Sequence, residues 1–229
     1  MEKKSEILEN FKTAIGSTVK SLSNSENIEV LFGNQNVEPK DNSINLPEIE
    51  EVNNKINYNQ IRAMADSKSL KLRFSDNLIF KLYEPDGNLS KKLYKIAEKI
   101  RCEKLGSDQF KGIKNNIEKY YRERTNSLDL KNSEDKIIES FENYLRVKLF
   151  DSKNSKELEK KLKSYQKDLN EKFKGKIKQL SNLTHDQAQY NSIISDLISN
   201  MNLDANREKE EKNEENKDKK QKDQKNQVL

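Results

Sequence analysis

Hydrophobic side chains recur every three or four residues along most of this chain, which is the spacing of one face of an α-helix. Residues 4–22 carry five of them in a single stripe: Leu8, Phe11, Ile15, Val19 and Leu22. Residues 58–74 repeat the pattern, with Ile61, Ala65 and Leu72 near one face and Met64 and Leu70 flanking it. We therefore predict a helix over each segment.

Three more stripes of the same kind complete a predicted core within residues 1–150. The first begins after the turn sequence Pro85-Asp86-Gly87-Asn88 and ends at Gly106, which we expect to cap the helix. Its apolar positions are Leu89, Leu93, Ile96 and Ile100. A shorter stripe has Phe110, Ile113, Ile117 and Tyr121, and one over 134–150 has Ile137, Ile138, Phe141, Leu145 and Leu149.

Beyond residue 154 the apolar positions narrow to a seam with charged neighbours, as in a coiled coil. The seam consists of Leu158, Leu162, Tyr165, Leu169, Phe173, Ile177 and Leu180. Gly175 inside it predicts a bend, because glycine costs a helix about 1 kcal/mol relative to alanine. Thr184-His185-Asp186-Gln187 fits a capping box that starts a last helix. We predict an antiparallel helical hairpin over 151–203.

Two short runs near the N-terminus instead have strand character. Ile28, Val30 and Phe32 alternate with other residues, and Ile44-Asn45-Leu46 precedes Pro47. The predicted fold class is thus mainly α: a multi-helix domain over 1–150 with a small β-hairpin, then the helical hairpin. Because no apolar residue lies between Ala205 and Val228, residues 204–229 are predicted to be a disordered charged tail.

Charge and cysteine content narrow the setting. The net charge is +5, and the tail holds eight acidic and eight basic residues, so the excess lies on residues 1–203. Lysines there alternate with acidic residues, which favours solvated helix faces over a nucleic-acid surface. The single cysteine, Cys102, is expected to be a packed thiol inside a helix, and no segment is apolar enough to span a membrane. We expect a cytoplasmic protein.

Signatures of catalysis are missing from the sequence. There is no GxxxxGK[ST] or GxGxxG loop and no GxSxG nucleophile motif. The single histidine, His185, falls at a predicted helix start, so we interpret it as a cap-region residue and not as a metal ligand. The sequence therefore predicts no catalytic or metal-binding residue.

Two polar clusters lie inside helices that otherwise look buried. The first is Arg62, Asp66 and Arg73, in which Arg62 and Asp66 are four residues apart and so neighbours on one helix face. The second continues beyond its helix and consists of Glu98, Arg101, Glu103, Gly106, Gly112 and Asn116. Two interpretations stay open: a structural network of ion pairs and caps, or a docking surface for a partner protein.

These stretches resemble the N-terminal region of CobT-type subunits of the aerobic, ATP-dependent cobaltochelatase. NIEVLF at 27–32 resembles the family's ELEVxF strand, and LPE at 46–48 its LPEP turn. RAMADSKSLKLR at 62–73 is similar to RGxADxxALxLR. EKIRCEKLGS at 98–107 and GIKNNI at 112–117 are similar to ExxRxEALGS and GVxxNL. All five occur in the family's order.

The resemblance implies a non-catalytic subunit of the enzyme that inserts cobalt into the corrin ring of hydrogenobyrinic acid a,c-diamide during cobalamin biosynthesis. It implies two partners, an AAA+ ATPase (CobS-type) and a large corrin-binding subunit (CobN-type). ATP, Mg²⁺ and Co²⁺ would be used by the complex and not held by this chain. The alternative is a helical scaffold or nucleic-acid-binding protein without a chelatase role.

The chain also departs from the family pattern. Ala63 replaces a glycine, Ser75 and Phe80 stand where the family usually has histidines, and Phe110 replaces a methionine. If those histidines serve metal or proton chemistry, this chain has lost it. Full-length relatives continue through a charged linker into a von Willebrand A-type domain with a DxSxS metal site. We expect the linker to begin at Asp204 and the chain to stop before that domain.

Overall fold

Helices dominate the computed structural model, as predicted. It describes residues 2–33, 42–49, 51–52, 55–126, 128, 130, 132–152 and 156–203. The helices in this part of the chain are α1 (Glu2–Ser23), α2 (Tyr58–Phe74), α3 (Asn77–Leu82), α4 (Asn88–Gln109), α5 (Lys111–Asn126), α6 (Ser133–Phe150), α7 (Lys156–Lys172), α8 (Lys176–Asn182) and α9 (Gln187–Ser199). The strands are β1 (Glu29–Phe32), β2 (Ser43–Leu46), β3 (Glu51–Val52) and β4 (Lys55–Ile56). The tail predicted over 204–229 lies outside the described residues.

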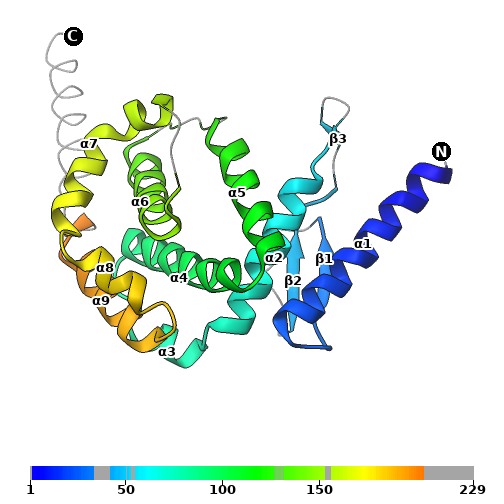
Figure 1. Cartoon of the computed structure of the whole chain (residues 1–229), viewed down its shortest axis with the longest axis horizontal. Helices are drawn as coiled ribbons and strands as arrows, with labels where there is room; N and C mark the ends of the chain where they lie inside the picture. The colour runs from blue at the N-terminus through cyan, green and yellow to red at the C-terminus, as the bar shows by residue number, and fades with distance from the viewer. Residues whose placement is uncertain are drawn as a thin grey trace, which may run out of the picture.

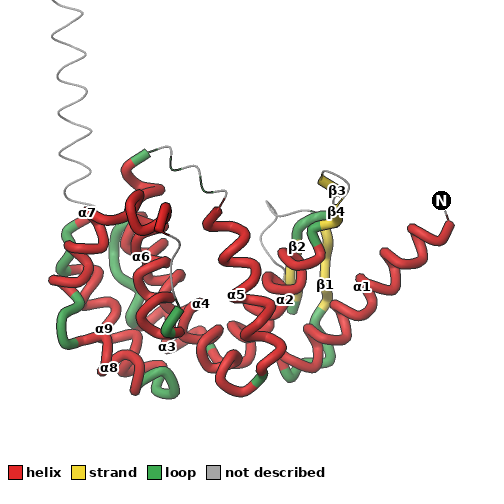
Figure 2. The backbone as a smooth tube through the Cα atoms, turned by 45° about the horizontal axis from the view of Figure 1, so that its top comes forward, coloured by secondary structure: helices red, strands yellow, loops and turns green. Residues whose placement is uncertain are grey.

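The buried hydrophobic residues form three clusters. The elements that contribute to them follow one another along the molecule (Figure 1). At the N-terminal end, α1, β1, β2 and α2 bury Ile15, Val19, Ile44 and Ile61 against one another. The largest cluster joins α3, α4 and α6 to α7, α8 and α9. Between the two, Leu22, Leu70, Cys102, Ile113 and Ile117 connect α1, α2, α4 and α5. The three clusters hold the described helices together as a curved, continuous body (Figure 2).

The N-terminal strands pair in the opposite sense to the prediction. β1 and β2 run parallel, in a register that sets Val30 beside Ile44 and Phe32 beside Leu46, so they do not form a hairpin. The expected β-hairpin was wrong because alternation of side chains shows which residues share a face but is the same for both strand directions. A small antiparallel hairpin does exist between β3 and β4, where no strand was predicted.

Two details of α2 and α4 also differ from the prediction. Gly106 does not end α4, which continues to Gln109 and closes with a bond from the Phe110 amide to the Gly106 carbonyl, 2.8 Å. A Cβ at Gly106 would lie 2.3 Å from a methyl group of Leu70, so this glycine allows α4 to cross α2 closely. Leu70 is accordingly buried, whereas Leu72, predicted for the core face, is 48% exposed.

The C-terminal helices close the largest cluster. α7 packs mainly on α6, while α9 packs on α4 and α3, so each arm of the predicted hairpin makes its main contacts with the preceding helices. The predicted bend occurs at Gly175, which has a positive φ of 77° and separates α7 from α8. The domain boundaries at residues 150 and 203 stay predictions. None of the helices in the described ranges has the length and apolar character needed to cross a bilayer.

Candidate functional site

Arg101 and Glu98 form a buried ion pair within α4. Both side chains are almost completely inaccessible, Arg101 at 1% and Glu98 at 0% exposure. The guanidinium donates from Nε to Glu98 Oε2 at 2.8 Å and from Nη2 to Glu98 Oε1 at 2.7 Å, which is the two-pronged geometry that arginine makes with a carboxylate. The structure therefore brings these two predicted site residues together.

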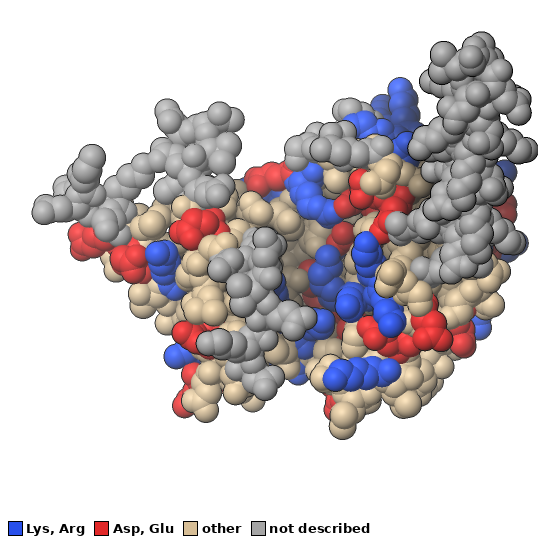
Figure 3. All heavy atoms as spheres, turned by 180° about the vertical axis from the view of Figure 1, so that it is seen from behind, with Lys and Arg blue, Asp and Glu red and all other residues tan. Residues whose placement is uncertain are grey.

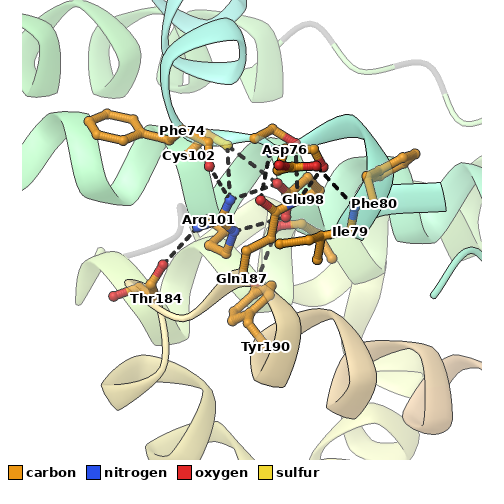
Figure 4. A network of polar contacts seen from close by, with 12 residues as sticks. Phe74, Asp76, Ile79, Phe80, Glu98, Arg101, Cys102, Thr184, Gln187 and Tyr190 are labelled. Atoms are coloured by element: carbon orange, nitrogen blue, oxygen red, sulfur yellow. Dashed lines mark hydrogen bonds and ion pairs between the residues drawn. The ribbon is translucent and has the colours of Figure 1, made fainter. Parts of the chain in front are cut away.

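The same guanidinium ties three separate parts of the chain to one another (Figure 4). Arg101 Nη1 donates to the carbonyl of Thr184, between α8 and α9, at 2.8 Å, and Nη2 donates to the carbonyl of Phe74, at the end of α2, at 2.6 Å. Glu98 neutralises the charge of Arg101. The guanidinium can therefore donate hydrogen bonds to two carbonyls far apart in sequence without being an unpaired cation in the interior. This node fixes α2 and the α8–α9 turn against α4.

Gln187 adds a second tie between the same elements. Its side-chain oxygen accepts from the backbone amide of Asp76 at 2.7 Å, and its Nε2 donates to the carbonyl of Asp76 at 2.9 Å. The predicted capping box at 184–187 is thus wrong in detail. The helix cap is Asp186, which accepts from the amide of Gln189, and Gln187 is turned away toward the start of α3.

Cys102 lies beside this node as a fully buried free thiol, as predicted. Burial, together with the negative charge of Glu98, raises the pKa of the Cys102 thiol well above its ordinary value. A protonated, inaccessible thiol is a poor nucleophile. The arrangement around Cys102 therefore fits packing.

Glu103 belongs to a different network, on the other side of α4. It accepts from Ser67 of α2 and pairs with Arg146 of α6, so it joins three helices. Arg146 also contacts Glu142 at 3.3 Å, and its guanidinium carbon lies 3.2 Å from the ring centroid of Tyr121 in α5. Glu103 and the Glu98–Arg101 pair therefore do not form the single cluster that their closeness in sequence predicted.

A cleft of about 470 Å³ between α5 and α6 is lined by this second network. Among its lining residues, Glu142 forms ion pairs with Arg124 at 3.2 Å and with Lys99 at 2.7 Å, and Arg124 also pairs with Glu139. Burial alone would raise the pKa of Glu142, but the charges of Lys99, Arg146 and Arg124 outweigh it and hold that pKa far below its usual range. Glu142 is therefore ionised at neutral pH.

Sequence reasoning missed most members of this network. Glu142 and Arg146 carried a usable signal, since they are four apart and lie among Phe141 and Leu145 on the apolar face of α6. Lys99 carried none, because its partner is 43 residues away.

Seen from behind, the molecule shows Lys and Arg side chains gathered around a central hollow with acidic side chains beside them (Figure 3).

Asp66 and Asn116 form a third contact, between α2 and α5. Asp66 is 4% exposed and accepts a 2.8 Å bond from Asn116 Nδ2. Burial raises the pKa of the Asp66 carboxyl, although the bond from Asn116 and the charge of Arg62 oppose this shift. Arg73, at the end of α2, donates from Nη1 to the carbonyl of Leu22 in α1 at 3.2 Å. These predicted residues hold helices together.

Two of the predicted residues take no part in these networks. Gly112 has open space around its Cβ position, so no close approach requires a glycine there. Arg62 forms no ion pair with Asp66 in the described structure, and its guanidinium carbon instead lies 5.7 Å from the ring centroid of Phe11. Arg62 is exposed to solvent.

Most of the predicted site residues make contacts between helices. Within the described ranges, no three His, Cys, Asp or Glu side chains come together in a way that could hold a metal ion. His185 lies exposed in the turn before α9. Most of the positions predicted as a docking or structural set thus make contacts between helices, whereas Arg62 and Gly112 are exposed and take no part in them. Arg73 is also exposed, but it bonds the carbonyl of Leu22.

Fold and networks together define a mainly helical protein whose buried charges join its helices to one another. The family model described as cobalamin biosynthesis protein CobT matches residues 5–228, so the chain belongs to the CobT family. Membership in this family gives the chain a role in cobalamin biosynthesis. A search of the solved structures found no match for it.

Proposed function

We propose that this chain is a non-catalytic subunit of an ATP-dependent cobaltochelatase and that it docks the AAA+ ATPase partner. The observation that carries the proposal is the family match over residues 5–228. In this scheme the AAA+ partner hydrolyses ATP with Mg²⁺. Cobalt, the metal substrate, enters the corrin ring of hydrogenobyrinic acid a,c-diamide on the large subunit.

The internal contacts support a mechanical role for the chain within that complex. Glu98, Arg101 and Glu103 spend their hydrogen-bonding capacity on other parts of the same chain. A subunit that transmits the conformational cycle of an ATPase has to move as a body, and buried ion pairs between helices resist deformation because separating them leaves charges unpaired. The family motifs thus supply a stiff framework, and its outer surface would make the contacts.

Association with the AAA+ subunit tests the proposal. The full chain and the AAA+ subunit should co-migrate in size-exclusion chromatography at micromolar concentrations in the presence of ATP and Mg²⁺, and the large subunit should join them. Filter binding to RNA and DNA at two salt concentrations serves as the comparison, because phosphate contacts weaken steeply with salt. Nucleic-acid binding without association would favour the alternative of a scaffold outside the chelatase.

A further inference from the structure

The N-terminal turns of α1 extend beyond the rest of the molecule and leave a groove against the start of α2. Both backbone views show this helix projecting outward (Figures 1 and 2). Ile7 on the projecting part is 59% exposed. The groove, of roughly 410 Å³, is lined by Ile7, Phe11, Tyr58, Asn59 and Arg62. Helical turns without a packing partner are only marginally stable in water, so a partner would stabilise this end.

The groove is aromatic and carries one cation without an ion-pair partner among the described side chains. The rings of Phe11 and Tyr58 lie with centroids 4.5 Å apart, and Arg62 lies over Phe11. Lys12, nearby on α1, is already paired with Glu9 at 3.1 Å. The carboxylate nearest to Arg62 in sequence, Asp66, is buried and held by Asn116.

We propose that this α1–α2 groove is the docking site for an acidic amphipathic segment of a partner protein. Apolar side chains of that segment pack on Ile7, Phe11 and Tyr58, and one of its carboxylates pairs with Arg62. Arginine beside aromatic rings is the composition that dominates binding energy at protein interfaces, and its planar guanidinium matches a carboxylate. The groove would form the centre of a larger contact.

This inference rests on the proposed function, because it takes the AAA+ subunit as the partner that supplies the segment. Its test measures the Kd of the full chain for that subunit, with ATP and Mg²⁺, for the wild type and four variants. Arg62→Glu reverses the charge, Arg62→Gln removes it with less risk to folding, and Ile7→Ser removes apolar contact from an exposed position. Arg122→Glu, an exposed arginine on α5 that lines the other cleft, is the matched control.

We expect Arg62→Glu to weaken binding at least tenfold, as charge reversal at a desolvated ion pair does, and Arg62→Gln and Ile7→Ser to weaken it several-fold. Arg122→Glu should bind like the wild type. Circular dichroism spectra should show that all variants keep their helix content.

Three results would overturn this inference, and each has a different consequence for the proposed function or for the occupant of the groove. Wild-type association that survives all three groove variants overturns this inference and leaves the proposed function standing. Absence of wild-type association overturns both. Self-association that depends on Arg62, measured by sedimentation velocity with the chain alone, would assign the groove to a second copy and overturn the acidic-segment proposal.

Discussion

Replacing Arg101 with methionine should destabilise the protein severely, because Arg101 neutralises a buried charge. Methionine has a similar length and fills most of the vacated volume, so the change removes the cation with little cavity. Glu98 would then be left at 0% exposure without the guanidinium that now lies 2.7–2.8 Å away. The carbonyls of Thr184 and Phe74 would lose their donor as well.

The magnitude follows from these losses. Removing one partner of a buried ion pair costs about 3–5 kcal/mol, and each buried acceptor left without a donor about 1–3 kcal/mol. The terms are not additive, and Phe74 is only partly buried, so we expect a loss of about 4 kcal/mol in the free energy of unfolding. That is a large fraction of the roughly 5–15 kcal/mol available to a domain.

Urea denaturation followed by circular dichroism at 222 nm measures this loss. Lys104→Met is the control on the same helix, since Lys104 pairs with Asp108 at the surface, and it should change stability by less than about 0.5 kcal/mol. The double variant Glu98→Gln with Arg101→Met should be more stable than Arg101→Met alone, because it no longer buries an unpaired carboxylate.

Two outcomes would contradict this role of Arg101. A cost below about 1 kcal/mol for Arg101→Met would mean that Glu98 finds water or another cation. Equal stability of the single and double variants would mean that the orphaned charge is not the source of the loss. Either result would remove the argument that this node fixes α2, α4 and the α8–α9 turn in place.

Other perturbations test the remaining contacts. Gly106→Ala should cost about 1–3 kcal/mol by forcing α2 and α4 apart, whereas Gly112→Ala, with open space around it, should raise stability by up to about 1 kcal/mol, so their urea midpoints should move in opposite directions. The pKa of Glu142 is lower in the folded protein than in the unfolded chain, where it is about 4.5, so Glu142 stabilises the fold fully above that pH and progressively less as the pH falls below it. Glu142→Gln should therefore flatten the acid side of a stability–pH curve. Asp66 has the opposite sign, because its raised pKa means that stability falls as pH rises from the unfolded value of 3.8 through the folded one. Asp66→Asn, which keeps an acceptor for the amide that bonds it, should therefore match or exceed wild-type stability at pH 7, while Asp66→Lys should abolish the helical circular dichroism signal at that pH.

Periodicity was sufficient to predict the long helices. In α1 the predicted stripe contains Ile15, Val19 and Leu22, and all three are buried. The stripe works because a long helix that packs along one side repeats its contact at every turn. α3 was not predicted, because its six residues make too few turns to show a repeat. Its start is instead held by the Asp76 cap and by the bond from the Asp76 amide to Gln187 of α9.

The roles of the glycines and the direction of the strands were harder to predict. A glycine can serve a turn, a helix end or a close crossing of two helices. Gly175 does bend the chain, with a positive φ, but Gly106 sits in regular helix and is needed for the approach of Leu70. The local sequence around Gly106 does not contain Leu70, so only tertiary packing separates a close crossing from a helix end. The relative direction of β1 and β2 is likewise not contained in the alternation of side chains within either strand.

Arg62 and Asp66 illustrate why the candidate site could be found but not assigned from sequence. Four residues advance a helix by about 400°, so the two side chains differ by only about 40° around α2. Only one of the two lies in the contact between α2 and α5. Asp66 lies within this contact and accepts a bond from Asn116, whereas Arg62 lies outside it and over the ring of Phe11. Two neighbours with one predicted role therefore have different ones. An ion pair inferred from spacing alone requires that both residues lie on the same side of the packing boundary, and that boundary is set by a helix 50 residues further along the chain.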